Sequence, residues 1–277
     1  MRNIGLHLRL TTTLSALFTR AQELKSPIVQ CFFIPQGSST YITFDDEQID
    51  LCLKKRDSFK ELYLHASYWV NLAGRRNNGW RSFHRELELA KKLAFTHIVI
   101  HPGSATGCVT KDEGIECLAR ALNKILSQEG EIKIVLENTA HGNKTVGGDI
   151  ADFAKLLNFL DYPEKVAFCL DSAHAYSYGY PFATVTDVEK FVQDVDLLIG
   201  AQRVALLHLN DAAQACGSRI DKHEVPGKGE IGTEALRAFM NHPKLVHTSV
   251  ILEMPVLDDS QERMLLKEVQ GWASLDT

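Results

Sequence analysis

Eight short apolar runs rich in β-branched residues recur along the chain, and longer segments with helical spacing of apolar residues separate them. The runs occupy Asn3–Leu8, Ile28–Phe33, Glu61–His65, His97–His101, Lys133–Glu137, Val166–Asp171, Val204–Leu209 and Thr248–Glu253. This alternation is typical of repeated strand–helix units, whose strands form a parallel sheet. Eight units in 277 residues fit a closed barrel, which needs about 250 residues, better than an open sheet, which has fewer strands. We therefore expect an α/β fold, a single-domain (β/α)8 TIM barrel over residues 1–277.

The segments between the runs support one continuous domain. The clearest predicted helices are Ser82–Leu93, Asp112–Leu126, Asp149–Leu160 and Ser260–Gln270. No linker divides the chain, and 45% apolar residues suffice for one large core. The amino terminus lacks a signal-like stretch, and no window approaches the ~18 apolar residues of a membrane span. Six cysteines without a C-x-x-C pair, with Cys31 and Cys169 inside predicted strands, indicate reduced thiols, so we expect a cytoplasmic protein.

Metal-capable side chains stand at the carboxyl ends of six predicted strands. They are His65, His101, Glu137, Asp171, His208 and Glu253, spaced 34 to 45 residues apart, or about one strand–helix unit. Because these ends meet at one face of a parallel barrel, where catalytic residues of that fold gather, the six predict one pocket. His174 follows the sixth strand by about one helical turn, and Asp221 and His223 lie in the long loop after the seventh.

These nine side chains comprise five imidazoles and four carboxylates, a mixture that suits Zn²⁺ or Mn²⁺ better than Ca²⁺. Nine donors exceed the needs of one ion, and with a bridging carboxylate they would hold two or three. A single strand-end histidine is more often a hydrogen-bonded structural residue, but unpaired carboxylates crowded together would repel one another, and cations resolve that conflict. We interpret His84, His97, His141, His242 and His247 as surface or helix-cap residues. His7 is expected to orient a ligand or a phosphate.

At these residues the chain resembles the endonuclease IV family of abasic-site endonucleases, from Gly5 to Pro255. The matching stretches are His65–Tyr68, His101–Ser104, Leu136–Ala140, Cys169–Ala175, His208–Asp211, Gly217–His223, Gly227–Gly232 and Leu252–Pro255. Every metal position of the family is filled here by a residue of the expected type.

The resemblance implies three ions, most simply Zn²⁺, with Mn²⁺ as the alternative. By it, His65, His101 and Glu137 hold one ion; Glu137 bridges to a second held by Asp171, His208 and Glu253; and His174, Asp221 and His223 hold the third. It further implies hydrolysis of the phosphodiester 5′ to abasic sites in damaged double-stranded DNA, leaving a 3′-hydroxyl and a 5′-deoxyribose phosphate. We assign Glu137 and Glu253 as catalytic carboxylates, and we expect a monomer.

The chain differs from the family in the segments with which family members contact DNA. The loop after the second strand, Ile34–Tyr41, lacks the family's arginine, for which Gln36 and Tyr41 are partial substitutes. Tyr68 and Trp69 either supply a planar wedge at the unstacked site or cap the barrel.

The charged residues give only weak guidance to DNA contacts. We expect Arg75, Arg76 and Lys228 to contact phosphates, whereas Lys54–Arg56 is predicted to be a solvated helix end. The formal net charge of −5 gives no reason to expect nucleic acid. Three divalent ions carry enough positive charge to offset it, concentrated at one site.

Two other functions fit parts of this pattern. A metal-dependent sugar isomerase or epimerase uses a similar barrel, but it does not need the late Asp221-x-His223 pair or the Gly-Lys-Gly loop. A catalytically silent DNA-binding or scaffold relative fits the altered loop and the acidic charge, but not the full ligand set. Turnover on an abasic oligonucleotide separates the three.

Overall fold

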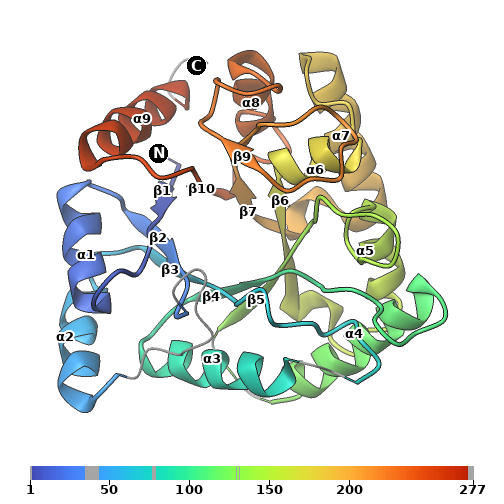
Figure 1. Cartoon of the computed structure of the whole chain (residues 1–277), viewed down its shortest axis with the longest axis horizontal. Coiled ribbons are helices and arrows are strands. Elements are labelled where there is room, and N and C mark those ends of the chain that lie inside the picture. The colour runs from blue at the N-terminus through green and yellow to red at the C-terminus, as the bar shows by residue number, and fades with distance from the viewer. Residues whose placement is uncertain (1, 35–43, 77–78, 129, 131, 274–277) are drawn as a thin grey trace.

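Eight parallel strands close into a barrel in the computed structural model, which describes residues 2–34, 44–76, 79–128, 130 and 132–273. The strands are β1 (Ile4–His7), β2 (Ile28–Cys31), β3 (Glu61–His65), β4 (His97–Ile100), β5 (Lys133–Glu137), β6 (Val166–Asp171), β7 (Val204–His208) and β10 (Ser249–Leu252). They follow one another around the ring in chain order, and β10 pairs with β1 to close it (Figure 1). The predicted TIM barrel is confirmed.

Helices surround this ring on its outside (Figure 1). They are α1 (Leu14–Glu23), α2 (Asp46–Arg56), α3 (Trp80–Lys92), α4 (Lys111–Leu126), α5 (Ile150–Leu157), α6 (Ser172–Tyr178), α7 (Val185–Ile199), α8 (Thr233–Met240) and α9 (Asp259–Trp272). Two 3-10 turns, Pro163–Lys165 and Ala201–Arg203, precede β6 and β7. The four predicted helices are present, and their ends differ from prediction by up to three residues.

Local sequence explains where several helices begin. Side chains of Thr13, Thr110 and Asp149 accept hydrogen bonds from backbone N–H groups in the first turns of α1, α4 and α5. Capping boxes begin α2, α7 and α9. Such caps satisfy amide donors that the helix itself leaves unpaired. Lys54–Arg56 form the last turn of α2, as predicted, but only Lys54 is fully exposed, and Lys55 and Arg56 donate hydrogen bonds to the carbonyls of Ser15 and Ala94.

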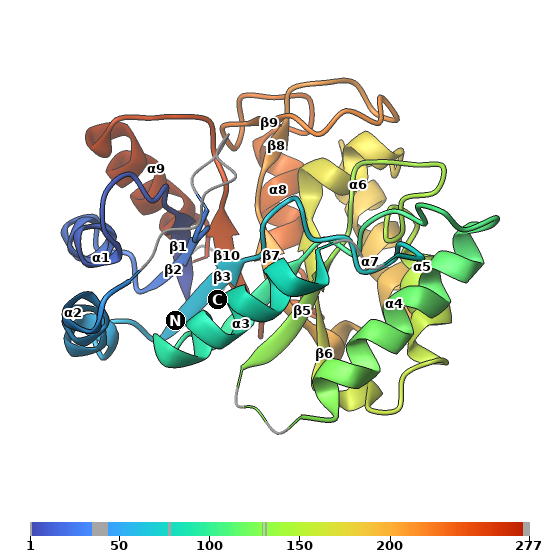
Figure 2. The same cartoon turned by 60° about the horizontal axis from the view of Figure 1, so that its bottom comes forward.

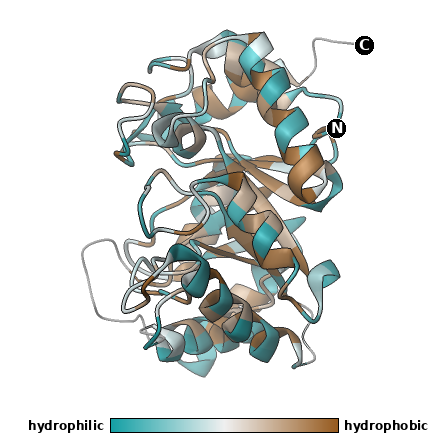
Figure 3. Cartoon of the chain, turned by 90° about the vertical axis from the view of Figure 1, so that its right-hand side faces the viewer, coloured by the Kyte–Doolittle hydropathy of each residue, from teal (hydrophilic) through white to brown (hydrophobic). Residues whose placement is uncertain are grey.

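The strands bury side chains on both faces, as expected for a parallel barrel. Residues facing the helices form the large core, together with the inner faces of α1 to α9. A smaller cluster fills the barrel itself: Ile28, Tyr63, Val99, Val135, Ala167, Cys169, Leu206 and Ile251. The strands are largely apolar in Figure 3, whereas the surrounding helices alternate apolar and polar stretches.

Long connections follow β6 and β7 at one end of the barrel. Two short strands, β8 (Asp211–Ala212) and β9 (His223–Glu224), pair antiparallel within the β7 connection. Figure 2 shows this hairpin above that end of the barrel, beside α6. The described cysteines are all free thiols, and Cys31 and Cys169 are buried as predicted. Among the described helices, none has the length and apolarity to traverse a bilayer.

Candidate metal centre

The period of the β-strand brings the predicted strand-end residues together. Side chains two positions apart on a strand lie on the same face. Each strand-end candidate stands two residues after a member of the cluster inside the barrel, as His65 follows Tyr63 and Glu253 follows Ile251. All six therefore point inward, one layer above the apolar filling, at the carboxyl ends of the strands.

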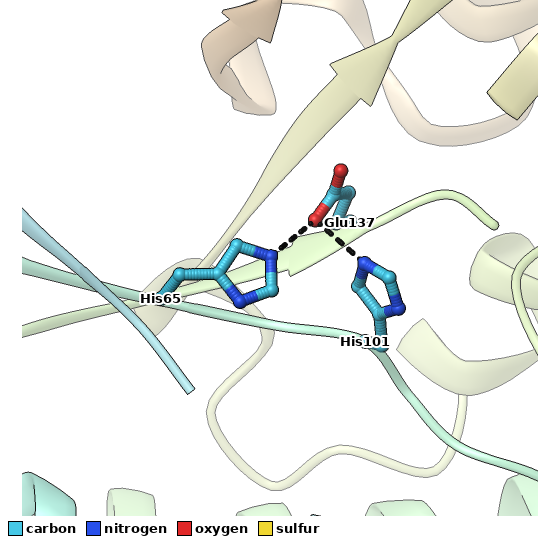
Figure 4. A group of neighbouring side chains, drawn as sticks. All are labelled: His65, His101 and Glu137. Atoms are coloured by element: carbon cyan, nitrogen blue, oxygen red, sulfur yellow. Dashed lines mark hydrogen bonds and ion pairs between the residues drawn. The ribbon is translucent and has the colours of Figure 1, made fainter. Parts of the chain in front are cut away.

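Glu137 lies at the centre of the group, and its carboxylate is fully buried. Its Oε2 atom is 3.0 Å from Nε2 of His65 and 3.0 Å from Nε2 of His101 (Figure 4). Its Oε1 atom is 2.8 Å from Nδ1 of His208 and 3.3 Å from Nδ1 of His174. One carboxylate thus faces four imidazoles from four different segments.

A second set of donors adjoins Oε1 of Glu137. Nδ1 of His208 lies 3.3 Å from Oε2 of Glu253 and 3.8 Å from Oδ2 of Asp171. One ligand atom from each of Glu137, Asp171, His208 and Glu253 lies within 4.8 Å of all the others. The thiol of Cys169 falls in a similar group with Glu137 and His208, although the sequence indicated only a buried thiol.

The third set comes from the loop after β7 and from α6. Nε2 of His174 and Nε2 of His223 face each other at 3.4 Å. Oδ1 of Asp221 lies 3.2 Å from the first and 3.3 Å from the second. Two imidazole nitrogens and a carboxylate oxygen therefore converge on one point, as the ligands of a zinc ion do.

Hydrogen bonds to carbonyl oxygens fix which nitrogen of four histidines carries the proton. His65 Nδ1 lies 2.8 Å from the carbonyl of Ala66, and His174 Nδ1 lies 2.8 Å from that of Asn138. His223 Nδ1 lies 2.9 Å from the carbonyl of Glu253, and His208 Nε2 lies 3.0 Å from the amide oxygen of Gln30. A carbonyl oxygen only accepts, so each of these nitrogens donates its N–H. In a neutral imidazole the other nitrogen then offers a lone pair, and all four lone pairs face the carboxylates.

Three buried amides that the sequence analysis missed hold these groups. Gln30 also donates from Nε2 to Oε1 of Glu253. Asn138 clamps the backbone of Asp171 from both sides, and Asn210 donates to Oδ2 of Asp171 at 2.6 Å. Each lies near the carboxyl end of a strand, as the predicted ligands do, and that position is the sequence signal that could have identified them. His7 donates from Nδ1 to Glu253 at 2.7 Å, in keeping with an orienting role.

The close packing of opposite charges shifts the pKa values of the cluster. Burial by itself raises the pKa of the Glu137 carboxyl, but the charges of His208 and His101 outweigh it and hold that pKa well below its ordinary value. The pKa values of Asp221 and Glu253 are lowered in the same way by neighbouring imidazoles. Against their own burial, the pKa values of His174 and His208 are raised well above the ordinary value. Without a cation the site is an imidazolium–carboxylate network, so cation binding must release protons.

The predicted wedge residues lie at the mouth of this site. Tyr68 and Trp69 follow β3 and are 64% and 68% exposed. Tyr68 packs its ring 5.7 Å from that of His101 and lines a cavity of about 860 Å³ together with His7 and Glu253. Such exposure favours a contact surface over a packed cap. The predicted loop substitutes Gln36 and Tyr41 lie outside the described residues.

The other predicted DNA contacts, Arg75, Arg76 and Lys228, lie outside the candidate metal centre. Lys228 is exposed in its glycine-flanked loop. That loop is held by Asp211, a buried carboxylate that accepts from the backbone N–H groups of Ala212, Gly227, Ile231 and Gly232 at 2.8, 2.9, 2.8 and 3.2 Å. Arg75 and Arg76 are exposed beside α3, where Arg75 pairs with Glu113 at 3.1 Å.

The five histidines set aside in the sequence lie outside every metal-capable group found among the described residues. His141 bonds to the Arg219 carbonyl at the surface. His84, also exposed, stacks on Trp80, and His247 lies against a backbone carbonyl. The other two, also predicted as surface or helix-cap residues, are less exposed than expected, because His97 is half-buried and His242, just after α8, is buried. His97 stacks on Tyr63 at 4.4 Å at the start of β4, and His242 is buried against Glu189.

The comparisons with known proteins agree with this geometry. Residues 18–274 match the family described as xylose isomerase-like TIM barrel. A probable endonuclease 4 from Chloroflexus aggregans is 29% identical over 96% of each chain, and one from Campylobacter concisus is 34% identical over 71% of this chain and 70% of that one. Endonuclease IV from Thermus thermophilus superposes with a TM-score of 0.85 at 27% identity, covering 100% of both chains.

Proposed function

Because the chain belongs to the endonuclease 4 family of xylose isomerase-like TIM barrels, we propose that it is a metal-dependent hydrolase that cuts DNA at abasic sites. The bond cleaved is the phosphodiester 5′ to the abasic sugar, which leaves a 3′-hydroxyl and a 5′-deoxyribose phosphate. Its substrate is damaged double-stranded DNA. All nine donors come from one chain, so a monomer suffices, and the free thiols suit a reducing compartment such as the cytoplasm.

One observation carries the proposal of a metal site. Four histidines have one nitrogen tied to a carbonyl-type oxygen, and their remaining nitrogens face four carboxylates, those of Glu137, Asp171, Asp221 and Glu253. Without a cation these nitrogens can pair with the carboxylates only when the imidazoles are protonated. A divalent cation would use them all.

We assign nine side chains to three zinc ions, with manganese as the alternative. His65, His101 and Glu137 would hold the first ion; Glu137, Asp171, His208 and Glu253 the second; and His174, Asp221 and His223 the third. When bound, such ions supply a nucleophile near neutral pH and neutralise charge on the phosphate.

The chain's own residues position the metal ligands and the DNA. Glu137 sets the spacing of four imidazoles, and Glu253 is held by His7 and Gln30. Tyr68 and Trp69, exposed beside the cavity, would stack in the gap that an abasic nucleotide leaves. Extruding such a nucleotide costs little stacking energy, so selectivity rests partly on the DNA.

The sugar isomerase alternative is disfavoured by the third donor set and by the exposed aromatic pair. An isomerase encloses a small sugar, whereas Trp69 stands 68% exposed at the mouth. A silent scaffold would have no need for nine intact donors.

The decisive experiment incubates metal-replete protein with an end-labelled abasic duplex and a matched intact duplex. We expect a nick only in the abasic duplex, with a 3′ end that a polymerase extends directly. A Glu137→Gln variant serves as the control for contaminating nucleases. Ketose–aldose interconversion without nicking would replace the proposal by the isomerase alternative.

A further inference from the structure

A second cavity, of about 660 Å³, lies outside the barrel between α3 and α4. These two helices are neighbours in both Figure 1 and Figure 2. The cations lining it are Arg75, Arg76, Arg81, Arg120 and Lys124. No carboxylate belongs to its lining among the described residues. Five cations around one cavity contrast with a chain whose net charge is −5.

These cations are only partly neutralised by the protein. Arg75 pairs with Glu113 at 3.1 Å, and Arg120 lies 3.7 Å from Glu116. Both pairs are solvent-exposed, so they stabilise the protein little and exchange easily.

The remaining cations have no carboxylate partner. Arg76 and Arg81 are exposed and make no hydrogen bond or ion pair with any residue that the structure describes. Lys124 lies over the ring of Trp80 at 4.7 Å. Like charges gathered in this way repel one another, and a bound anion would relieve the repulsion.

The backbone adds to the positive potential of the cavity. Gly79 precedes the first turn of α3 and provides no side-chain cap, and Gly79, Trp80, Arg81 and Ser82 all line the cavity. Helix amino termini favour phosphate groups. Guanidinium groups bind phosphate oxygens through paired N–H donors.

One connection joins this cavity to the metal centre. The segment between β3 and α3 carries Tyr68 and Trp69 at one end, beside His101, and Arg75 and Arg76 at the other. A duplex whose abasic site lies at the metal centre would extend past its rim, where this segment leads. The cations are therefore placed for the strand backbone that flanks the damage.

We propose that the cavity lined by Arg75, Arg76, Arg81, Arg120 and Lys124 binds backbone phosphates of the DNA flanking the abasic site. This inference rests on the proposed function, and it identifies DNA, not a small phosphorylated metabolite or an acidic protein, as the ligand. Binding at this cavity would make the affinity for DNA depend on the length of duplex beside the abasic site. It would also offset the negative net charge of the protein, which otherwise opposes DNA binding. Affinity should rise with duplex length until the flank reaches α4.

The test compares Arg81→Ala/Arg120→Ala with the control Arg263→Ala/Lys267→Ala, which removes the same charge from exposed positions of α9. Metal-loaded proteins are titrated with duplexes that carry an uncleavable abasic analogue, in a short and a long version. For the long duplex we expect about tenfold weaker binding in the first variant, and a salt dependence shallower by about 2 in log–log slope, because roughly 0.9 is lost per phosphate contact. Binding of the short duplex and its turnover should stay at the parental level.

Several outcomes would overturn the inference. The inference fails if the variant loses the same affinity for the short and long duplexes, if the control variant loses as much affinity, or if binding of the long duplex is unchanged. Binding of inorganic phosphate or an acidic peptide that Arg81→Ala/Arg120→Ala abolishes, with DNA affinity unchanged, would assign the cavity to another ligand. If the protein fails to nick abasic DNA but the variant still loses affinity for the long duplex alone, the proposed function is wrong and the assignment of a DNA-binding surface is retained.

Discussion

Replacing Glu137 by alanine should remove catalysis with little change to the fold. The carboxylate contacts four imidazoles at 2.8 to 3.3 Å and lies at the junction of two proposed metal sites. A ligand shared by two ions supports charge stabilisation worth several kcal/mol. At about 1.4 kcal/mol per tenfold, a loss of about 4 kcal/mol lowers kcat roughly 10³-fold.

The stability of the same variant gives a second readout. Glu137 is not part of the apolar filling of the barrel, which ends one layer below it. The metal-replete Glu137→Ala variant should therefore fold, but hold fewer ions than the parent. Elemental analysis measures the metal content, urea unfolding measures the stability, and single-turnover cleavage measures the rate of catalysis, each independently of the others.

Glu86→Gln provides a matched control. This carboxylate is equally buried, but it accepts hydrogen bonds from the Ser67 amide and the Ser82 hydroxyl. Its substitution should leave the metal content unchanged. Near-parental turnover and metal content in Glu137→Ala would refute the bridging role, and a similar loss of metal in Glu86→Gln would show that burial of charge, not ligation, governs the effect.

Four further results are expected. Reconstituted protein should carry about two to three equivalents of zinc or manganese, and elemental analysis below one equivalent would contradict the donor count. In metal-free protein the raised pKa values of His174 and His208 contribute stability that is complete below about 6.5 and is lost as pH rises through the folded-state values. Urea unfolding should therefore show decreasing stability above neutral pH while zinc affinity increases, and the opposite trends would argue against protonated imidazoles. Tyr68→Ala combined with Trp69→Ala should weaken binding to abasic duplex more than to intact duplex in a fluorescence titration, whereas equal losses would return the pair to a capping role. Asp211→Asn turns one acceptor oxygen into a donor facing two backbone N–H groups, so it should cost about 2–4 kcal/mol of unfolding free energy, and an unchanged urea midpoint would show that the loop is held otherwise.

The sequence predicts the barrel and its inward-facing end well because both depend on short-range periodicity. The alternation of side chains along a strand puts Tyr63 and His65 on the same face, and this follows from the local sequence alone. A ring of parallel strands then brings such positions from different strands together. The same period places Gln30 two residues after Ile28 of the barrel filling, but it does not reveal what Gln30 contacts. Its importance comes from contacts to His208 and Glu253, which lie far along the chain and are set by the closing of the ring.

Two other features depend on tertiary structure in the same way. His97 begins a strand and looks solvent-facing in the sequence, but it stacks on Tyr63 across the neighbouring strand. The cavity between α3 and α4 joins cations from a loop and two helices, and only Arg75 and Arg76 are adjacent in the chain. Sequence spacing identifies those two as candidates and gives no reason to group them with Arg120 or Lys124.

The pairing of β1 with β10 constrains how the protein is made. Ile4 lies opposite Val250, so the ring closes only after nearly all of the chain has been synthesised. Protein synthesis adds roughly 5–20 residues per second, so a sheet of seven strands exists for a time with two unpaired edges before the eighth strand leaves the ribosome. Open edges of this kind invite pairing with other chains. Glu253 follows that last strand, so the donor set of Glu137, Asp171, His208 and Glu253 is completed last, whereas the donors of the other two sets are synthesised before the ring can close.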